Sequence, residues 1–91
     1  MAISVLIPTV LRKYTSGTDQ VVAHGASVRE VLQDLERQFT GFSQNLYEAD
    51  GELKAFVNIY VNEEDIRFLQ DLQTPVQPND TVTILPAIAG G

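Results

Sequence analysis

The last two residues, Gly90 and Gly91, are the part of this sequence best suited to chemistry. They end a short apolar tail, Pro86-Ala87-Ile88-Ala89, which follows an alternating stretch of strand type. Glycine has no side chain, so such an end can thread a narrow channel and leaves the α-carboxylate of Gly91 sterically open. A carboxylate is a poor electrophile until it becomes a mixed anhydride, for example with AMP. The pattern predicts a protein whose own C-terminus is the reagent, while a partner performs the catalysis.

Other chemical signals in the sequence are weak. It contains no phosphate-cradling, dinucleotide-binding or zinc-peptidase motif. Cysteine is absent, which removes disulfides, thiolate metal sites and cysteine nucleophiles. The single histidine, His24, stands at a strand end without a motif and reads as a surface residue. Glu63-Glu64-Asp65 are consecutive rather than spaced as a coordinating loop requires, and this favours a solvated turn. We therefore expect no enzyme activity, no bound cofactor and no metal.

Length and charge narrow the classes further. With 91 residues, the chain predicts one domain spanning 1–91, with a flexible tail over 86–91. Twelve acidic residues against six basic ones give a net charge of −6. Such a surface repels nucleic acid and anionic lipid and favours a basic protein partner. The first five residues lack the charged and long apolar regions of a signal peptide, so we expect a cytoplasmic protein.

One helix is predicted with clear boundaries. Ser27 and Glu30 have the spacing of a capping box, in which each side chain bonds the other's backbone amide. One apolar stripe follows: Val28, Val31, Leu32, Leu35 and Phe39. The other side carries polar residues, namely Arg29, Gln33, Glu36 and Arg37. Gly41 is the expected C-terminal stop.

Strands are predicted over 3–7, 20–24, 56–61 and 81–85, with a short one over 66–68. The segment 69–76 is predicted as a loop, with a helical turn within it as the alternative. The order strand, strand, helix, strand, short strand, strand favours an α+β roll, with a mixed sheet of four to five strands and one main helix on one face. The opposite face must be solvated or must meet a partner.

Side-chain alternation predicts which residues lie on that uncovered face. If Val57, Ile59 and Val82 face the helix, their neighbours in sequence face outward. We expect an apolar docking patch there, made of Leu6, Phe56, Tyr60, Phe68 and Leu85.

The chain resembles the ubiquitin-like sulfur carrier proteins of the β-grasp fold, which include the thiamine sulfur carrier and the small subunit of molybdopterin synthase. The resemblance covers nearly the whole chain. Besides the strand order and Gly90-Gly91, it rests on the segments 7–9, 56–62, 65–68 and 82–91. These look most like the carrier that supplies sulfur to a PLP-dependent cysteine synthase.

The resemblance implies that an ubiquitin-activating-like adenylyltransferase uses ATP to adenylate Gly91, which then becomes a thiocarboxylate. The tail from Pro86 through Ala87, Ile88, Ala89 and Gly90 would thread into the partner. The sulfur acceptor would be the cysteine synthase or, alternatively, the large subunit of molybdopterin synthase. Two other classes stay open: a protein modifier that forms isopeptide bonds through Gly91, and an interaction module with an inert tail.

Overall fold

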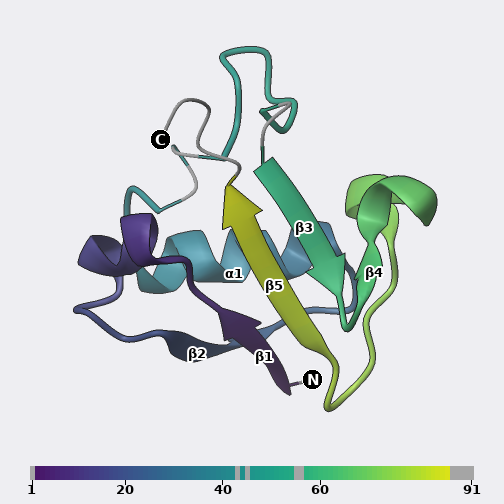
Figure 1. Ribbon diagram of the computed structural model, residues 1–91, viewed down its shortest axis with the longest axis horizontal. Coiled ribbons are helices and arrows are strands. Elements are labelled where there is room, and N and C mark those ends of the chain that lie inside the picture. Colours follow the sequence, from purple (N-terminus) through teal and green to yellow (C-terminus); the bar gives the residue numbers. More distant parts are fainter. Residues whose placement is uncertain (1, 43, 45, 55–56, 87–91) are drawn as a thin grey trace.

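A five-stranded sheet forms the body of the molecule, in the strand order β2-β1-β5-β3-β4 (Figure 1). The structure is a computed structural model and describes residues 2–42, 44, 46–54 and 57–86. The strands are β1 (Ala2–Leu6), β2 (Gln20–His24), β3 (Val57–Val61), β4 (Glu64–Asp65) and β5 (Thr81–Pro86). β1 and β5 run parallel, whereas the β1–β2, β3–β5 and β3–β4 pairs are antiparallel. The predicted mixed sheet is therefore confirmed, with the last strand returning to its centre.

The helix α1 (Val28–Gln38) crosses one face of this sheet (Figure 1). Ser27 is its N-cap, and the Ser27 hydroxyl accepts a hydrogen bond from the Glu30 amide at 3.3 Å, as predicted. The reciprocal half of the capping box differs, because the Glu30 carboxylate accepts from the amide of Ala26 rather than of Ser27. The expected stripe is buried from Val28 to Leu35, while Phe39 is the half-buried C-cap.

The core lies between α1 and the sheet. On the sheet side, alternate strand residues are buried: Ile3, Val5, Val57, Ile59, Val82 and Ile84. Phe42 and Leu46, from the connection after α1, are also fully buried, and the Phe42 ring packs edge-on against Tyr14 at 6.5 Å between centroids. One helix covers one face of the sheet, so the predicted α+β roll is confirmed.

Three short 3₁₀ helices complete the described chain: η1 (Thr9–Tyr14), η3 (Ile66–Phe68) and η4 (Asp71–Gln73). The prediction of a strand over 66–68 was wrong. The Asp65 carboxylate accepts a hydrogen bond from the Arg67 amide at 2.8 Å, and the Leu69 amide donates one to the Ile66 carbonyl. These local hydrogen bonds stabilise a helical turn in place of a strand. The strand that pairs with the outer edge of β3 is instead the acidic pair Glu64–Asp65, which was expected to be only a turn.

Candidate functional site

The tail begins where β5 ends, at one end of the sheet. β5 pairs with β3 as far as Pro86, which lies opposite Val57. The end of β5, the start of β3 and the loop 46–54 gather at this end (Figure 1). Of the tail predicted to enter the partner, only Pro86 is described; Ala87 to Gly90 and Gly91, the predicted reactive residue, lie outside the described residues. The structure therefore defines the anchor of the tail, and the role of the tail stays a prediction.

Strand register places three residues of the predicted patch on the uncovered face. Leu6 lies opposite Thr83 in the parallel pair, and Thr83 lies opposite Tyr60 in the antiparallel pair. Directly opposed residues share a face, so these three form one row across β1, β5 and β3. Leu85 belongs to the same face because it stands two residues beyond Thr83 on β5. We call these four residues, Leu6, Tyr60, Thr83 and Leu85, the docking face.

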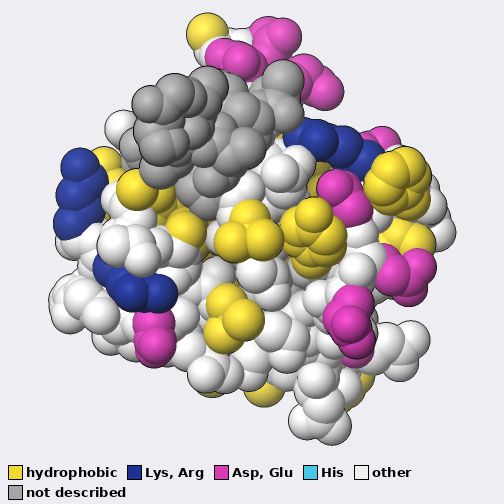
Figure 2. Space-filling view, viewed as in Figure 1, with side chains coloured by type: hydrophobic (Ala, Val, Ile, Leu, Met, Phe, Trp, Pro, Cys, Tyr) yellow, Lys and Arg dark blue, Asp and Glu magenta, His cyan; other side chains and the backbone are white. Residues whose placement is uncertain are grey.

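The docking face is accessible to a partner. Leu6 is 37% exposed and Leu85 is 49% exposed, whereas Tyr60 and Thr83 are half-buried. Figure 2 shows hydrophobic side chains gathered over the middle of this side of the molecule, with charged side chains toward its margins. An apolar centre with a polar margin is typical of protein interaction surfaces.

A shallow groove of about 400 Å³ adjoins the docking face. It opens where β1 leaves β5: their pairing stops at Leu6 and Thr83, although β5 continues to pair with β3 up to Pro86. One wall carries Thr83 and Leu85, and the opposite wall is made by Leu6 and the turn at Pro8. The groove thus extends the docking face toward the point where the tail begins.

Sequence reasoning missed the polar residues of this groove. Arg12 and Asp19 both line it, and the Arg12 Nε donates to the Ile7 carbonyl at 3.1 Å. Arg12 lies in η1, whose six residues have too little periodicity to be recognised as a helix. The one available signal was Pro8, because proline ends β1 and is the N-cap of η1.

Two other patch predictions have different outcomes. Phe56 lies outside the described residues. Phe68 is 86% exposed, but it belongs to η3, beyond the edge strand β4, and not to a strand of the uncovered face. The strand predicted over 66–68 does not form. Phe68 therefore extends no row of the docking face.

Two groups among the described residues have a shifted pKa, and neither of them belongs to the docking face. Burial raises the pKa of the Tyr47 phenol, opposed by the nearby positive charge of Arg29. A hydrogen bond from Arg37 is the largest cause that lowers the pKa of Asp34, against a partial opposing effect of burial. Within the described ranges, no group of three or more His, Asp or Glu side chains could hold a metal ion. The docking face is thus suited to binding a partner.

In the part of the chain that the structure describes, no helix has the length and apolarity needed to cross a membrane. The helix α1 has 11 residues and buries only one stripe.

The fold places the chain among the β-grasp proteins, which pack one helix on a mixed sheet. The chain is similar to a chain in a crystal structure of the Amycolatopsis orientalis BexX/CysO complex, with a TM-score of 0.92 and 46% identity over 99% of this chain and 100% of that one. A profile of the ThiS family matches residues 5–91. The chain therefore belongs to the ThiS family, the ubiquitin-like sulfur carriers that the sequence resembles.

Two curated relatives refine this assignment. The sulfur carrier protein CysO of Mycobacterium tuberculosis is 47% identical over 93 aligned residues, which cover the whole of both chains. Small archaeal modifier protein 3 of Haloferax volcanii is 36% identical over 66 residues, covering 72% of this chain and 71% of the relative.

Proposed function

We propose that this protein carries sulfur as a thiocarboxylate on Gly91 and delivers it for cysteine biosynthesis. The observation that carries the proposal is the 47% identity to the sulfur carrier CysO along the whole chain, including its glycine end. The family match also extends to residue 91. An accessible docking face beside the start of the tail supports the proposal, because a partner that takes the tail must also hold the body.

The proposed chemistry belongs to an activating partner of the adenylyltransferase class. One oxygen of the Gly91 carboxylate attacks the α-phosphorus of ATP, which forms an acyl adenylate and releases pyrophosphate. A hydrosulfide-equivalent nucleophile then attacks the acyl carbon, and AMP leaves. The carrier contributes an unhindered carboxylate and a surface that orients it. In this scheme it is a co-substrate, and it binds neither ATP nor a cofactor itself.

The acceptor in this proposal is a PLP-dependent cysteine synthase. The large subunit of molybdopterin synthase is the alternative, since it needs the same thiocarboxylate. The similarity to a chain crystallised as a BexX/CysO complex supports the idea that the fold works by binding other proteins. ATP and these partners are cytoplasmic in the proposal, so the carrier is placed there too.

A second candidate function is protein modification. It is favoured by the 36% identity to small archaeal modifier protein 3. An activated C-terminal glycine can react with a lysine amine, which forms an isopeptide bond and releases AMP, as readily as it reacts with a sulfur nucleophile. Both functions need the same free Gly91, so they are distinguished by the reaction product, a thiocarboxylate or an isopeptide conjugate.

Mass spectrometry of the protein isolated from its own cells tests the proposal. We expect a C-terminal peptide whose mass reflects exchange of one oxygen for sulfur at Gly91. Lysine-linked conjugates without that exchange would support modification instead. If cells grown under sulfur limitation contained neither the thiocarboxylate nor the conjugates, both functions would be contradicted.

Deletion of Gly91, or one residue added after it, provides the matched test in vitro. We expect ATP–pyrophosphate exchange by the activating enzyme to be lost in both variants. Circular dichroism and thermal melting should match the wild type, because both changes lie beyond the last strand. Undiminished exchange by a blocked terminus would refute activation at Gly91.

A further inference from the structure

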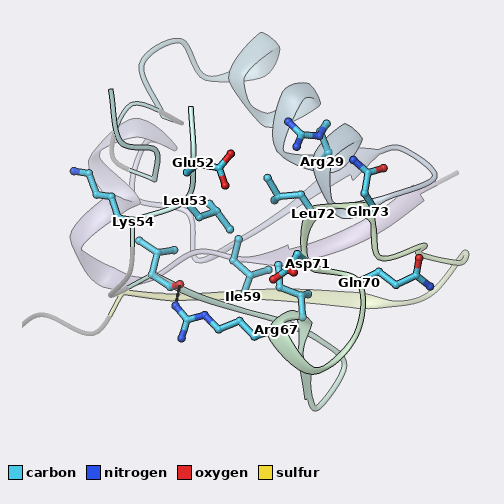
Figure 3. Close-up of a pocket in the computed structure, with 12 residues that line it drawn as sticks. Arg29, Glu52, Leu53, Lys54, Ile59, Arg67, Gln70, Asp71, Leu72 and Gln73 are labelled. Carbon is cyan, nitrogen blue, oxygen red and sulfur yellow. Dashed lines mark hydrogen bonds between the residues drawn. The ribbon is translucent and has the colours of Figure 1, made fainter. Parts of the chain in front are cut away.

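A second cavity, of about 670 Å³, lies on the helix-covered side of the sheet beside β3 (Figure 3). Its volume is within the range of about 300–1,000 Å³ that is usual for small-molecule sites. Apolar side chains form the floor: Leu53, Val57, Ile59, Ile66 and Leu72. They come from β3, from both 3₁₀ turns after it and from the loop before it, so the cavity is a junction of several elements.

The rim of this cavity is rich in positive charge. Arg29, Lys54 and Arg67 line it, which is half of the six basic residues in the chain. Only two of the twelve acidic residues, Glu52 and Asp71, line it as well. Figure 3 shows Arg29 on the side of α1 and Arg67 beside the strand, whereas the Lys54 side chain points away from the other lining residues and the carboxylates of Glu52 and Asp71 lie among them. The lining thus carries one more positive than negative charge, whereas the whole chain has a net charge of −6, so this cavity is a more favourable place for an anion than the average surface.

Arg29 stands in a position that does not favour a cation. It is the second residue of α1, where the positive end of the helix dipole repels positive charge and favours a carboxylate. Arg29 is exposed, and the structure gives it no carboxylate within ion-pair distance among the described residues. Helix stability therefore does not explain an arginine here, whereas an anionic ligand in the cavity would.

The opposite rim is held in place by local hydrogen bonds. The Arg67 Nη2 donates to the Val57 carbonyl at 2.9 Å, so its guanidinium lies along the edge of the cavity floor. Asp71 has a φ of 51°, a left-handed conformation that is uncommon for a residue other than glycine. The buried Thr74 fixes this turn, since its hydroxyl accepts from the Gln70 amide and its own amide donates to the Asp71 carbonyl, both at 3.0 Å. A preformed wall lowers the entropic cost of binding.

We propose that this cavity binds a small organic anion, with its apolar body on the floor and its carboxylate, sulfonate or phosphate group beside Arg29. A small anion fits better than an acidic protein segment, because the overall negative charge of the chain repels an extended acidic partner more strongly than a single charge. This site goes beyond the proposed function and does not depend on it. It lies on the opposite side of the sheet from the docking face.

The test uses anilinonaphthalene sulfonate, a fluorescent aromatic anion, and its uncharged analogue phenylnaphthylamine. We expect saturable binding of the anion to one site of the full-length protein, followed by fluorescence and by amide chemical shifts. The shifts should change at Ile59, Ile66 and Leu72. The uncharged analogue should bind about tenfold more weakly, since it loses the charge-assisted contact.

Matched variants assign the charge contribution. Arg29→Gln should weaken binding of the anion about tenfold, whereas Lys13→Gln, the same charge change on the exposed side of η1, should leave it unchanged. Gln73→Glu adds a carboxylate at the rim and should also weaken binding, unlike Gln33→Glu on the exposed side of α1. Thermal melts confirm that each variant is folded.

Three results would overturn the proposal. The first is equal binding of the charged and uncharged dyes. The second is equal effects of Arg29→Gln and Lys13→Gln. The third is chemical-shift changes confined to Leu6 and Leu85, which would assign the dye to the docking face. None of these results bears on Gly91 activation, so the proposed function is tested separately.

Discussion

Gly25 lies directly against the first turn of α1, and a Cβ on Gly25 would stand 2.8 Å from the Cβ of Glu30. The same Cβ would be 2.8 Å from the backbone nitrogen of Val31. Backbone atoms cannot move aside as the end of a flexible side chain can. The connection from β2 to α1 therefore passes the helix at a distance that only glycine allows.

Gly25→Ala should destabilise the protein by about 1–3 kcal/mol, because the added methyl group overpacks this contact. For a domain of this size, each kcal/mol lowers the melting temperature by about 4–8 °C. Chemical denaturation measures the change, with Thr40→Ala, at an exposed position, as the control. A Gly25→Ala protein as stable as the wild type would mean that the β2–α1 connection shifts at little cost.

Leu35→Ala should cost about 2–5 kcal/mol, since Leu35 is fully buried in the middle of α1. Gln33→Ala is the matched control, because Gln33 is exposed on the same helix. Glu36 would be a poor control, although the sequence placed it on the polar side: it is half-buried, and its carboxylate accepts from the Gly41 amide at 2.8 Å. Equal losses from Leu35→Ala and Gln33→Ala in urea unfolding would contradict the observed helix rotation.

Asp34 should make stability depend on acidity. Its carboxylate accepts from Arg37 at 3.0 Å, from the His24 amide at 2.9 Å and from Gln38 at 2.8 Å, so it ties α1 to β2. The Arg37 hydrogen bond is the main cause of its lowered pKa. The folded protein thus binds this proton less tightly than the unfolded chain does. The stabilisation is complete above the ordinary Asp pKa of about 3.9 and is lost as pH falls through the lowered value.

Unfolding free energies of the wild type and Asp34→Asn, measured from neutral pH down to about pH 2.5, check this expectation. The advantage of the wild type at neutral pH should shrink below about pH 4. The difference in unfolding free energy between the wild type and Arg37→Gln should be smaller than for Asp34→Asn, and it should also shrink as the pH falls. A constant difference between wild type and Asp34→Asn across the range would exclude Asp34 as the responsible group.

Leu85→Asp should weaken binding to the proposed activating enzyme more than it weakens folding. Leu85 is 49% exposed, so a carboxylate there stays hydrated in the free protein. In a complex this carboxylate would lose its hydration without gaining a compensating positive charge, at a cost on the order of several kcal/mol. Gly91 lies six residues away, within about 20 Å at the maximum advance of about 3.3–3.6 Å per residue.

Val22→Asp is the matched control for this prediction. Val22 is 52% exposed, and it lies opposite Ser4 on the same uncovered face but on β2, two strands from β5. Titration calorimetry should show a large loss of affinity for Leu85→Asp and a small one for Val22→Asp. Equal affinities of both variants and the wild type would show that the enzyme holds another surface.

The elements with a strong hydrophobic period were predictable from the sequence. The stripe from Val28 to Phe39 and the N-cap at Ser27 predicted α1, which begins at Val28 and ends at Gln38, one residue before the end of the stripe. Alternation in β3 and β5 predicted which of their side chains face the helix, because a strand with one buried face has a period of two. Leu6, Tyr60 and Leu85 were placed on the uncovered face for the same reason.

Short elements were less predictable because tertiary contacts decide them. Ile66-Arg67-Phe68 has the composition of a strand, yet the Asp65 side chain and the burial of Ile66 favour a 3₁₀ turn. No local pattern in the sequence predicts the cavity beside β3 either. Arg29, Lys54 and Arg67 are separated by 25 and 13 positions in the chain, and only the packing of η3 and α1 around β3 brings them to one rim.

The central position of β5 also determines how the molecule resists mechanical force. A partner that pulls on the tail loads a strand held on both sides, paired with β3 from Val82 to Pro86 and with β1 from Thr81 to Thr83. Tension along the strand axis shears these pairs together, whereas tension on an edge strand can open hydrogen bonds one after another. The folded domain should therefore stay intact when a partner applies force to Gly91.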